Sequence, residues 1–280
     1  LAENPRLVSE NLWVYTPPPV VPMGRLTDRR MFEAAYAFNQ ARLRAGVQQA
    51  CQALGMDRPL LWISFNVLSS ESLIGALNEQ LVVYHCTDEI TAMVGNSPFV
   101  GEIERRLLSK AHLAFCSSRT LASAKGPFCR EAHFVPNGGD TALFETARDP
   151  ATRPHPQLAD VAGRGPVFGF AGHLEERFDF ALIKALAEAQ PTWCFALAGP
   201  VAASRRAAAE QLARLPNVRL LGLLPRPELP AFLKACDVGL IPFVHSAQTR
   251  AIYPLKLNEY LAAGKPVALT PFADLREFAG

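Results

Sequence analysis

Short apolar runs separated by segments of helical pattern limit the fold of this chain more than any other feature. In the first half the apolar runs predict strands at 12–16, 60–64, 81–85, 113–117 and 133–135. Segments of helical spacing lie between them, at 28–54, 70–77, 98–110 and 118–124. Strands that are apolar throughout and alternate with helices are typical of a parallel sheet covered on both faces. The pattern therefore predicts an α/β fold.

A stretch rich in Pro and Gly interrupts this alternation between residues 145 and 165 and predicts a linker. The pattern then restarts, with strands expected at 167–171, 194–198, 218–221, 238–242 and 266–269 and helices at 180–189, 204–215, 227–235 and 255–263. We therefore expect two Rossmann-like domains, residues 1–150 and 151–280. Ligands of open α/β sheets bind beyond the carboxyl ends of the strands. A cleft between the two sheets is expected to take a small molecule or a nucleotide.

Composition excludes several classes of protein. Hydrophobic residues make up 49% of the chain and charged residues 19%, which excludes global disorder. The net charge of +2 is far from the basic balance of a nucleic-acid-binding protein, so no nucleic-acid partner is expected. The six cysteines lack the spacing of a zinc site and are expected to be core thiols in the reducing cytoplasm. No apolar run is long enough to span a bilayer.

The most informative motif covers residues 253–267. Elsewhere the sequence contains no dinucleotide-binding glycine motif, no P-loop, no serine-hydrolase elbow and no HExxH. In this motif a loop enters a helix at Pro254, a residue favoured in the first helical turn. The N–H groups of Leu255 and Lys256 at that helix start favour an anion, and Lys256 adds a full charge. Glu259, one turn further on, can accept hydrogen bonds from a sugar diol. Phosphate and diol together are what a nucleotide diphosphate offers.

This motif resembles the donor site of retaining glycosyltransferases with the GT-B fold, of the family-4 type. The similarity is greatest to the bacterial branch that makes polysaccharides and teichuronic acid. Residues 135–140 (VPNGGD) resemble the turn that ends the first domain in that family, and residues 170–173 (FAGH) resemble the first loop of its second domain. Weaker similarities lie at 84–89, 199–200, 221–229 and 235–238, so the resemblance extends from about residue 60 to 280.

The sequence departs from the family pattern in two places. The family has two Glu residues around the proline; Glu259 matches the second, which holds the ribose, but Ala251 stands where the first contacts the donor sugar. The family also supplies an Arg and a Lys to the diphosphate from the loop at 172–180. Here Arg177 can provide one cation, and Lys256 is expected to replace the missing Lys. The first strand and glycine loop of the family, and its closing helices, have no counterpart, so a fragment incomplete at both ends is expected.

The resemblance implies a metal-independent bacterial glycosyltransferase that acts in the cytoplasm. Such an enzyme moves a sugar from a nucleotide-diphospho-sugar to a glycan or lipid-linked acceptor and retains the anomeric configuration. No metal and no cofactor besides the donor substrate are expected. The expected catalytic residues are Asp88, Arg177 and Lys256. The expected donor-binding residues are Gly172, His173, Leu223, Tyr253, Pro254, Leu255 and Glu259.

Several alternatives stay open. Asp88 and Glu89 are either N-cap residues after a strand or acids on the acceptor side, with Asp88 as a general base. The arginine pairs at 105–106 and 205–206 are either solvated helix faces or a peripheral contact with the cytoplasmic face of a membrane. Ala251 and the missing Lys leave open a degenerate GT-B subunit that binds without turnover. Carboxylates in the cleft leave open a sugar-nucleotide epimerase on the same fold.

Overall fold

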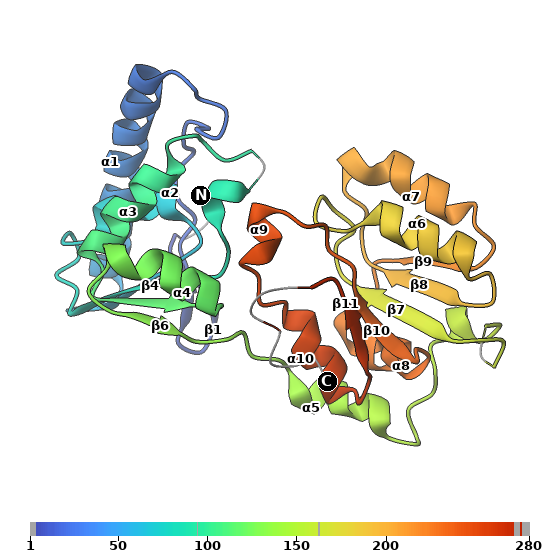
Figure 1. The fold of residues 1–280 in the computed structure, drawn as a ribbon. Helices are drawn as coiled ribbons and strands as arrows, with labels where there is room; N and C mark the ends of the chain where they lie inside the picture. The colour runs from blue at the N-terminus through green and yellow to red at the C-terminus, as the bar shows by residue number, and fades with distance from the viewer. Residues whose placement is uncertain (1–3, 94, 162, 272–274, 276–280) are drawn as a thin grey trace. The chain divides into compact units, whose positions relative to one another are not determined.

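Strands and helices alternate along the chain and form two α/β units (Figure 1). The computed structural model describes most of the chain, namely residues 4–93, 95–161, 163–271 and 275. Unit 1 comprises the residues up to Pro136 together with Arg250–Ile252, and unit 2 comprises Asn137–Thr249 and the residues from Tyr253 onward. Each unit has its own parallel sheet and its own apolar core.

Unit 1 is built on four parallel strands in the order β3-β4-β5-β6. These strands are β3 Leu60–Ser64, β4 Leu81–Cys86, β5 Leu113–Cys116 and β6 Ala132–Phe134. The helices are α1 Arg29–Ala53, α2 Val67–Ser70, α3 Val100–Lys110 and α4 Arg119–Lys125, with 3-10 turns η1 Glu71–Leu73, η2 Ile90–Ala92 and η3 Gly126–Phe128. The strands follow one another in space as they do in the sequence. Right-handed connections in that order place their helices on one face of the sheet.

Helices cover only one face of this sheet within the described residues. On the covered face Tyr84 of β4 packs into a core with Phe32 of α1. The opposite face carries Trp62, His85 and Phe115 in a row across three strands, and Trp62 is 52% exposed. The expected covering of both faces is therefore not found in the described part of unit 1, because every strand connection crosses on the same side.

A hairpin and a long helix precede the sheet. The hairpin pairs β1 Arg6–Ser9 with β2 Leu12–Val14 in antiparallel fashion. The sequence predicts only β2, because β1 is too short and too polar to form an apolar run. Asp28 caps α1 by accepting a hydrogen bond from the backbone N–H of Met31 at 2.9 Å, so the helix begins where its pattern does.

Unit 2 has five parallel strands in the order β11-β10-β7-β8-β9. They are β7 Val167–Ala171, β8 Cys194–Ala198, β9 Val218–Gly222, β10 Val238–Ile241 and β11 Val267–Leu269. The helices are α5 Thr141–Glu145, α6 Phe180–Ala189, α7 Arg206–Ala213, α8 Leu229–Lys234, α9 Ala247–Arg250 and α10 Leu255–Ala262, with turns η4 Thr146–Arg148, η5 Pro156–Leu158, η6 Ala203–Arg205 and η7 Arg226–Glu228. The strand order reverses between β7 and β10. Such a reversal opens a crevice at the carboxyl ends of the strands.

The division between the units differs from the expected one. It falls between Pro136 and Asn137 rather than at residue 150, because α5 already belongs to unit 2. Phe144 of α5 is 1% exposed in the core of that unit, and so is Leu158 of η5. The Pro- and Gly-rich stretch is therefore a set of loops and short turns of unit 2 and not a linker.

Two other elements differ in detail. The helix expected at 70–77 is split into α2 and η1 and ends at Leu73, since Gly75 turns the chain with a φ of +78°. The sequence suggests that Pro254 lies in the first turn of its helix. In the structure Pro254 is the N-cap of α10, and the helix begins one residue later, at Leu255. No helix among the described residues is long and apolar enough to cross a membrane.

Candidate functional site

The carboxyl edge of the unit 2 sheet is built from backbone at its centre. Gly172 follows β7 and Gly199 follows β8, and a Cβ atom on Gly199 would lie 1.9 Å from the carbonyl oxygen of Gly172. The Gly172 N–H donates to the carbonyl of Ala198 at 2.8 Å, and the Gly199 N–H donates to the carbonyl of Gly222 at 2.7 Å. The two glycines allow these strand ends to approach without side chains between them. Gly172, an expected donor-binding residue, therefore lies at a closely packed strand edge.

Helix α10 is anchored beside this edge. The hydroxyl of Tyr260 accepts a hydrogen bond from the backbone N–H of Ala171 at 2.9 Å, at the end of β7. Tyr260 is fully buried and packs against Gly239 of β10, where a Cβ atom would lie 2.4 Å from its ring. The helix start therefore has a fixed position relative to the ends of β7 and β10.

The N-terminus of α10 presents unused hydrogen-bond donors. The N–H of Leu257 donates to the carbonyl of Pro254 at 3.0 Å, whereas the N–H groups of Leu255 and Lys256 have no acceptor among the described residues. Pro254 caps the helix without a side-chain acceptor. Two N–H donors without an acceptor in the described part of the chain, at the positive end of a helix dipole, can bind an anion, and that they bind a phosphate stays a prediction.

Lys256 reaches from α10 to the strand edge. A Cβ atom on Gly172 would lie 2.3 Å from Cε of Lys256, so the ammonium group lies directly over the glycine. Its Nζ is 5.4 Å from the ring centroid of Phe170. Burial lowers the pKa of Lys256, Arg177 lowers it further, and the carboxylates of Glu259 and Glu175 oppose the shift. The structure thus brings together Lys256 and Gly172, two residues that the sequence predicts for the same site.

Glu259 lies one turn into α10 and is 9% exposed. Burial raises the pKa of its carboxyl group, while Lys256 and Arg226 oppose this rise. Neither the Glu259 carboxylate nor the Lys256 ammonium has a hydrogen-bond or ion-pair partner in the described part of the chain. A buried charge without a partner is costly, so both groups gain from a polar ligand.

The loop after β7 holds the other expected phosphate contacts. Arg177 donates from Nε to Oε1 of Glu175 at 2.6 Å, and its guanidinium carbon lies 5.8 Å from the ring centroid of Phe243. His173 is exposed, with Nδ1 3.8 Å from Oε2 of Glu175. Glu175 is a residue that the sequence analysis missed, because a single acidic residue in a loop carries no motif. Arg177 therefore shares its charge with Glu175.

The remaining expected donor-binding residues differ in exposure. Leu223 follows β9 and is 76% exposed, which suits a side chain that covers a flat ligand. Leu255 is 42% exposed at the helix start. Tyr253 is buried at 7% and its hydroxyl donates to Oδ1 of Asn258 at 3.0 Å. Asn258, which the sequence analysis did not select, is thus linked by a hydrogen bond to Tyr253, an expected donor-binding residue.

The acidic pair after β4 lies in unit 1. Glu89 is the N-cap of η2, accepts from the backbone N–H of Thr91 at 3.2 Å and pairs with Nζ of Lys125 at 2.9 Å. Lys125 also pairs with buried Glu104 at 2.8 Å. Glu89 therefore has the capping position that the sequence analysis left open for it. The role of neighbouring Asp88 stays a prediction.

Ala251, at the departure from the family pattern, is a buried residue of unit 1. It is 4% exposed and packs in the core of that unit. Its carbonyl accepts a hydrogen bond from Oγ of Ser118 at 2.7 Å, and the same Oγ caps α4 by accepting from the N–H of Leu121. The position is filled by packing, and a carboxylate there would need a polar partner.

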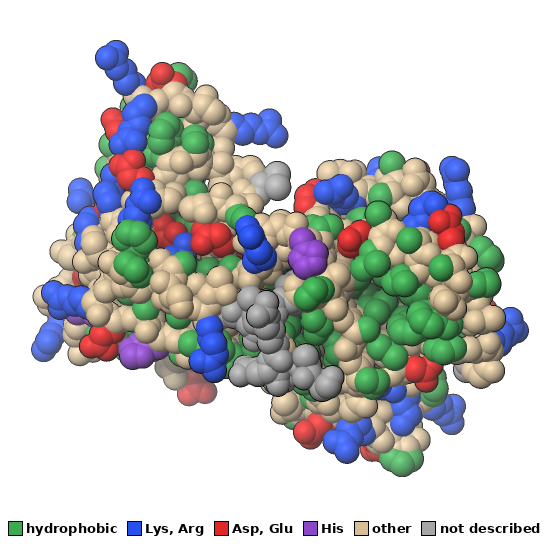
Figure 2. All heavy atoms as spheres, in the orientation of Figure 1, with side chains coloured by type: hydrophobic (Ala, Val, Ile, Leu, Met, Phe, Trp, Pro, Cys, Tyr) green, Lys and Arg blue, Asp and Glu red, His purple; other side chains and the backbone are tan. Residues whose placement is uncertain are grey.

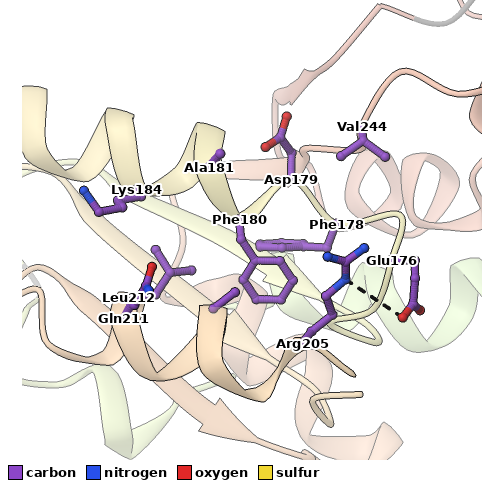
Figure 3. Close-up of a pocket in the computed structure, with 11 residues that line it drawn as sticks. Glu176, Phe178, Asp179, Phe180, Ala181, Lys184, Arg205, Gln211, Leu212 and Val244 are labelled. Carbon is purple, nitrogen blue, oxygen red and sulfur yellow. Dashed lines mark ion pairs between the residues drawn. The ribbon is translucent and has the colours of Figure 1, made fainter. Parts of the chain in front are cut away.

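A pocket of about 340 Å³ lies elsewhere in unit 2, between α6 and α7 (Figure 3). Phe178, Phe180 and Leu212 form apolar walls, and Arg205 lies 3.9 Å from Glu176 at the rim. None of the residues expected to bind the donor lines this pocket. Gly172 and Glu259 lie instead at the strand edge and on α10, and their role in donor binding stays a prediction.

On the face drawn in Figure 2, the Lys and Arg side chains are dispersed and do not gather into one patch. Among the described residues, no group of three His, Cys, Asp or Glu side chains is arranged to hold a metal ion.

Comparison with known proteins finds a family match for the part of the chain that contains α10. Residues 165–280 match the sequence profile of the glycosyl transferases group 1. The chain is 33% identical over 228 residues to a Bacillus subtilis (strain 168) protein named as the teichuronic acid biosynthesis glycosyltransferase TuaH, covering 76% of this chain. It spans 56% of that relative, or about half its length.

Solved structures of low sequence identity share the fold. Sucrose-phosphate synthase from Thermosynechococcus elongatus matches 97% of this chain and 69% of its own, with a TM-score of 0.71 and 15% identity. HepE from Anabaena, solved in complex with UDP and glucose, matches 84% of this chain and 65% of its own, with a TM-score of 0.63 and 19% identity.

Proposed function

We propose that the protein, whose residues 165–280 match the group 1 glycosyltransferases and whose chain has the GT-B fold, transfers a sugar from a nucleotide-diphospho-sugar to a glycan or lipid-linked acceptor. The proposed reaction retains the anomeric configuration and needs no metal. The relatives support the donor class, because HepE was solved with UDP and glucose. The name of TuaH supports a polysaccharide acceptor.

The observation that carries this proposal is the pair of unpartnered charges on α10. Lys256 and Glu259 are partly desolvated, have opposite charges and lack partners among the described residues, beside two unused N–H donors. A diphosphate would satisfy the N–H groups and Lys256, and the ribose hydroxyls would satisfy Glu259. A nucleoside diphosphate would therefore provide hydrogen-bond or ion-pair partners for all these groups.

The proposed chemistry follows from where charge develops. As the bond between the sugar C1 and the diphosphate oxygen breaks, the electron pair stays on the diphosphate. Lys256, the N-terminal N–H groups of α10 and Arg177 stabilise that growing charge. The acceptor oxygen bonds to C1 on the face that the leaving group vacates, and its proton passes to a phosphate oxygen. Asp88 is the protein base to test if the phosphate does not take this proton.

The setting of the reaction is part of the proposal. All six cysteines are free thiols, four of them buried, which supports a reducing compartment. We therefore propose a cytoplasmic reaction. Contact with a membrane through the arginine pairs is the means by which a lipid-linked acceptor would be reached.

Calorimetric titration of the natural full-length protein with UDP, ADP and GDP tests the donor site. We expect Glu259→Ala to weaken nucleotide binding at least about tenfold, since hydrogen bonds to a charged group contribute about 1.5–3 kcal/mol each. Lys256→Ala should weaken binding of the diphosphate far more than binding of the corresponding nucleoside, because Lys256 contacts only phosphate.

Lys184→Ala is the matched control, since Lys184 lies on α6, at the pocket outside the donor site, and pairs with Glu188. It should leave nucleotide affinity unchanged. Equal affinity of the parent protein, Lys256→Ala and Glu259→Ala for the bound diphosphate would refute the donor assignment.

Ala251 favours a second candidate, a GT-B subunit that binds the donor without turnover. The alanine is packed in a core and offers no group to a donor sugar. Incubation with the bound nucleotide-sugar and candidate acceptors distinguishes the two functions. Release of nucleoside diphosphate supports the transferase, and stable binding without release supports the second candidate.

A further inference from the structure

Three residues near the start of α10 form a closed ring of hydrogen bonds. Nδ2 of Asn137 donates to the carbonyl of Tyr253 at 2.8 Å. The hydroxyl of Tyr253 donates to Oδ1 of Asn258 at 3.0 Å. Nδ2 of Asn258 then donates to the carbonyl of Asn137 at 2.5 Å. Each side chain donates to the next residue, so both amide groups have a defined orientation.

The ring joins two points at which the chain passes into unit 2. Asn137 is the first residue of that unit after Pro136, and Tyr253 is the first after the unit 1 segment Arg250–Ile252. Packing reinforces the link, because a Cβ atom on Gly139 would lie only 3.0 Å from Cβ of Asn258. The turn at 137–140 is therefore fitted closely to the first turn of α10.

The ring also surrounds the peptide that leads into the phosphate site. Tyr253 contributes its carbonyl and its hydroxyl, so its backbone is held from one side and its side chain from the other. Pro254 follows it with a fixed φ of −73°. The next two residues carry the N–H groups that lack acceptors. The direction of those N–H groups thus depends on a peptide that the ring immobilises.

We propose that Asn137 and Asn258 are positioning residues for the donor diphosphate. They hold the Tyr253–Pro254 peptide so that the N–H groups of Leu255 and Lys256 point at the phosphates before the ligand arrives. Without the ring this loop would have to be ordered during binding, and that entropy cost would weaken the complex. This inference rests on the proposed donor site; neither Asn137 nor Asn258 carries a charge.

Asn258→Asp and Asn137→Asp in the natural full-length protein test it. Each change keeps the shape of the side chain and removes the N–H donor. We expect affinity for the bound nucleoside diphosphate to fall by about tenfold or more in each variant. Affinity for the matching nucleoside should stay within about twofold. In a turnover assay the donor KM should rise while the acceptor KM is unchanged.

Asn217→Asp is the matched control. Asn217 lies in the same unit, and its Nδ2 also donates to backbone carbonyls, those of Ala187, Gln190 and Trp193 at 3.0–3.2 Å. It lies before β9, away from α10 in the sequence of elements. We expect Asn217→Asp to lower the melting temperature as much as the ring variants do and to leave the affinity for the diphosphate unchanged. This result would show that the loss of affinity in the ring variants does not come from lower stability.

Other outcomes are decisive as well. If the parent protein binds the diphosphate and both ring variants bind it equally well, the positioning role is refuted and the donor site stands. If the parent protein binds none of the nucleoside diphosphates, the proposed function fails and this inference fails with it. If an Asp variant does not fold, Tyr253→Phe opens the same ring without adding charge and should show the same selective loss.

Discussion

At the scale of single residues, the candidate site contains two ionisable side chains, Lys256 and Glu259, whose pKa values burial shifts toward each other. Burial lowers the pKa of Lys256 and raises that of Glu259. The proposed donor site needs Lys256 protonated and Glu259 ionised. Affinity for a nucleoside diphosphate should therefore fall as pH rises through the lowered pKa of Lys256. It should also fall as pH drops through the raised pKa of Glu259.

Titrations over a pH series would show this as a narrow optimum. Lys256→Met should remove the alkaline loss and keep the acidic one, and Glu259→Gln should do the reverse. If the affinity instead stayed high over the whole range between the ordinary pKa values of glutamate and lysine, about 4.3 to 10.4, the pKa shifts of Glu259 and Lys256 would be contradicted.

At the scale of elements, one buried carboxylate joins three helical segments of unit 1. Glu71 of η1 accepts from Nη2 of Arg106 at 2.9 Å and from Nζ of Lys110 at 2.7 Å, both on α3, and from Tyr36 of α1 at 2.5 Å. Burial raises the pKa of Glu71, but these three hydrogen bonds outweigh it and lower the pKa to about 2. The ionised form of Glu71 is therefore the form that holds the helices together.

We expect Glu71→Gln to destabilise the protein by about 1–3 kcal/mol at neutral pH, because it leaves charged partners with a weaker acceptor. A pKa lowered on folding gives stability that is complete above the unfolded value of 4.5 and is lost as pH falls toward about 2. In urea unfolding, the difference in unfolding free energy between the parent protein and Glu71→Gln should therefore become smaller as the pH falls from 4.5 toward about 2. If this difference in unfolding free energy did not change with pH, the ionised carboxylate of Glu71 would not be the stabilising form.

Elements were also the scale at which the sequence was most informative. Strands such as β8, apolar at every position, and helices with a cap such as Asp28 carry their own signal, and the structure confirms them. Short or polar elements carry none, so β1 and α5 were missed. Candidate site residues stand out in the sequence where charge lies at a helix start, as with Lys256. Asn137 and Asn258 were not, because a hydrogen bond across 121 residues leaves no local pattern.

At the scale of the whole molecule, two separate cores suggest two separate unfolding events. Trp193 of unit 2 stacks on Phe168 with ring centroids 4.6 Å apart, whereas the other two of the three Trp residues, Trp13 and Trp62, belong to unit 1. In a Trp13→Phe, Trp62→Phe variant, fluorescence reports on unit 2 alone. A nucleoside diphosphate at about 100 times its Kd should stabilise that transition by about 2.7 kcal/mol.

Hydrogen exchange provides the comparison within one sample. Amides of β8 should gain protection from the ligand, while amides of β4 should not. Equal gains in β4 and β8, with a single coincident transition, would show that the protein unfolds as one cooperative body.

The chain route through the two units bears on how the protein is made. Domains generally fold in order from the N-terminus during synthesis. Here Ser118 of unit 1 finds its acceptor on Ala251, 133 residues later, and Asn137 of unit 2 receives its hydrogen bond from Asn258, 121 residues later. A nascent chain that has left the ribosome up to residue 249 has therefore completed neither unit. Residues 250–252 complete unit 1, whereas unit 2 still needs α10 and then β11, so a ribosome that stalls shortly before residue 250 would release two unfinished units at once.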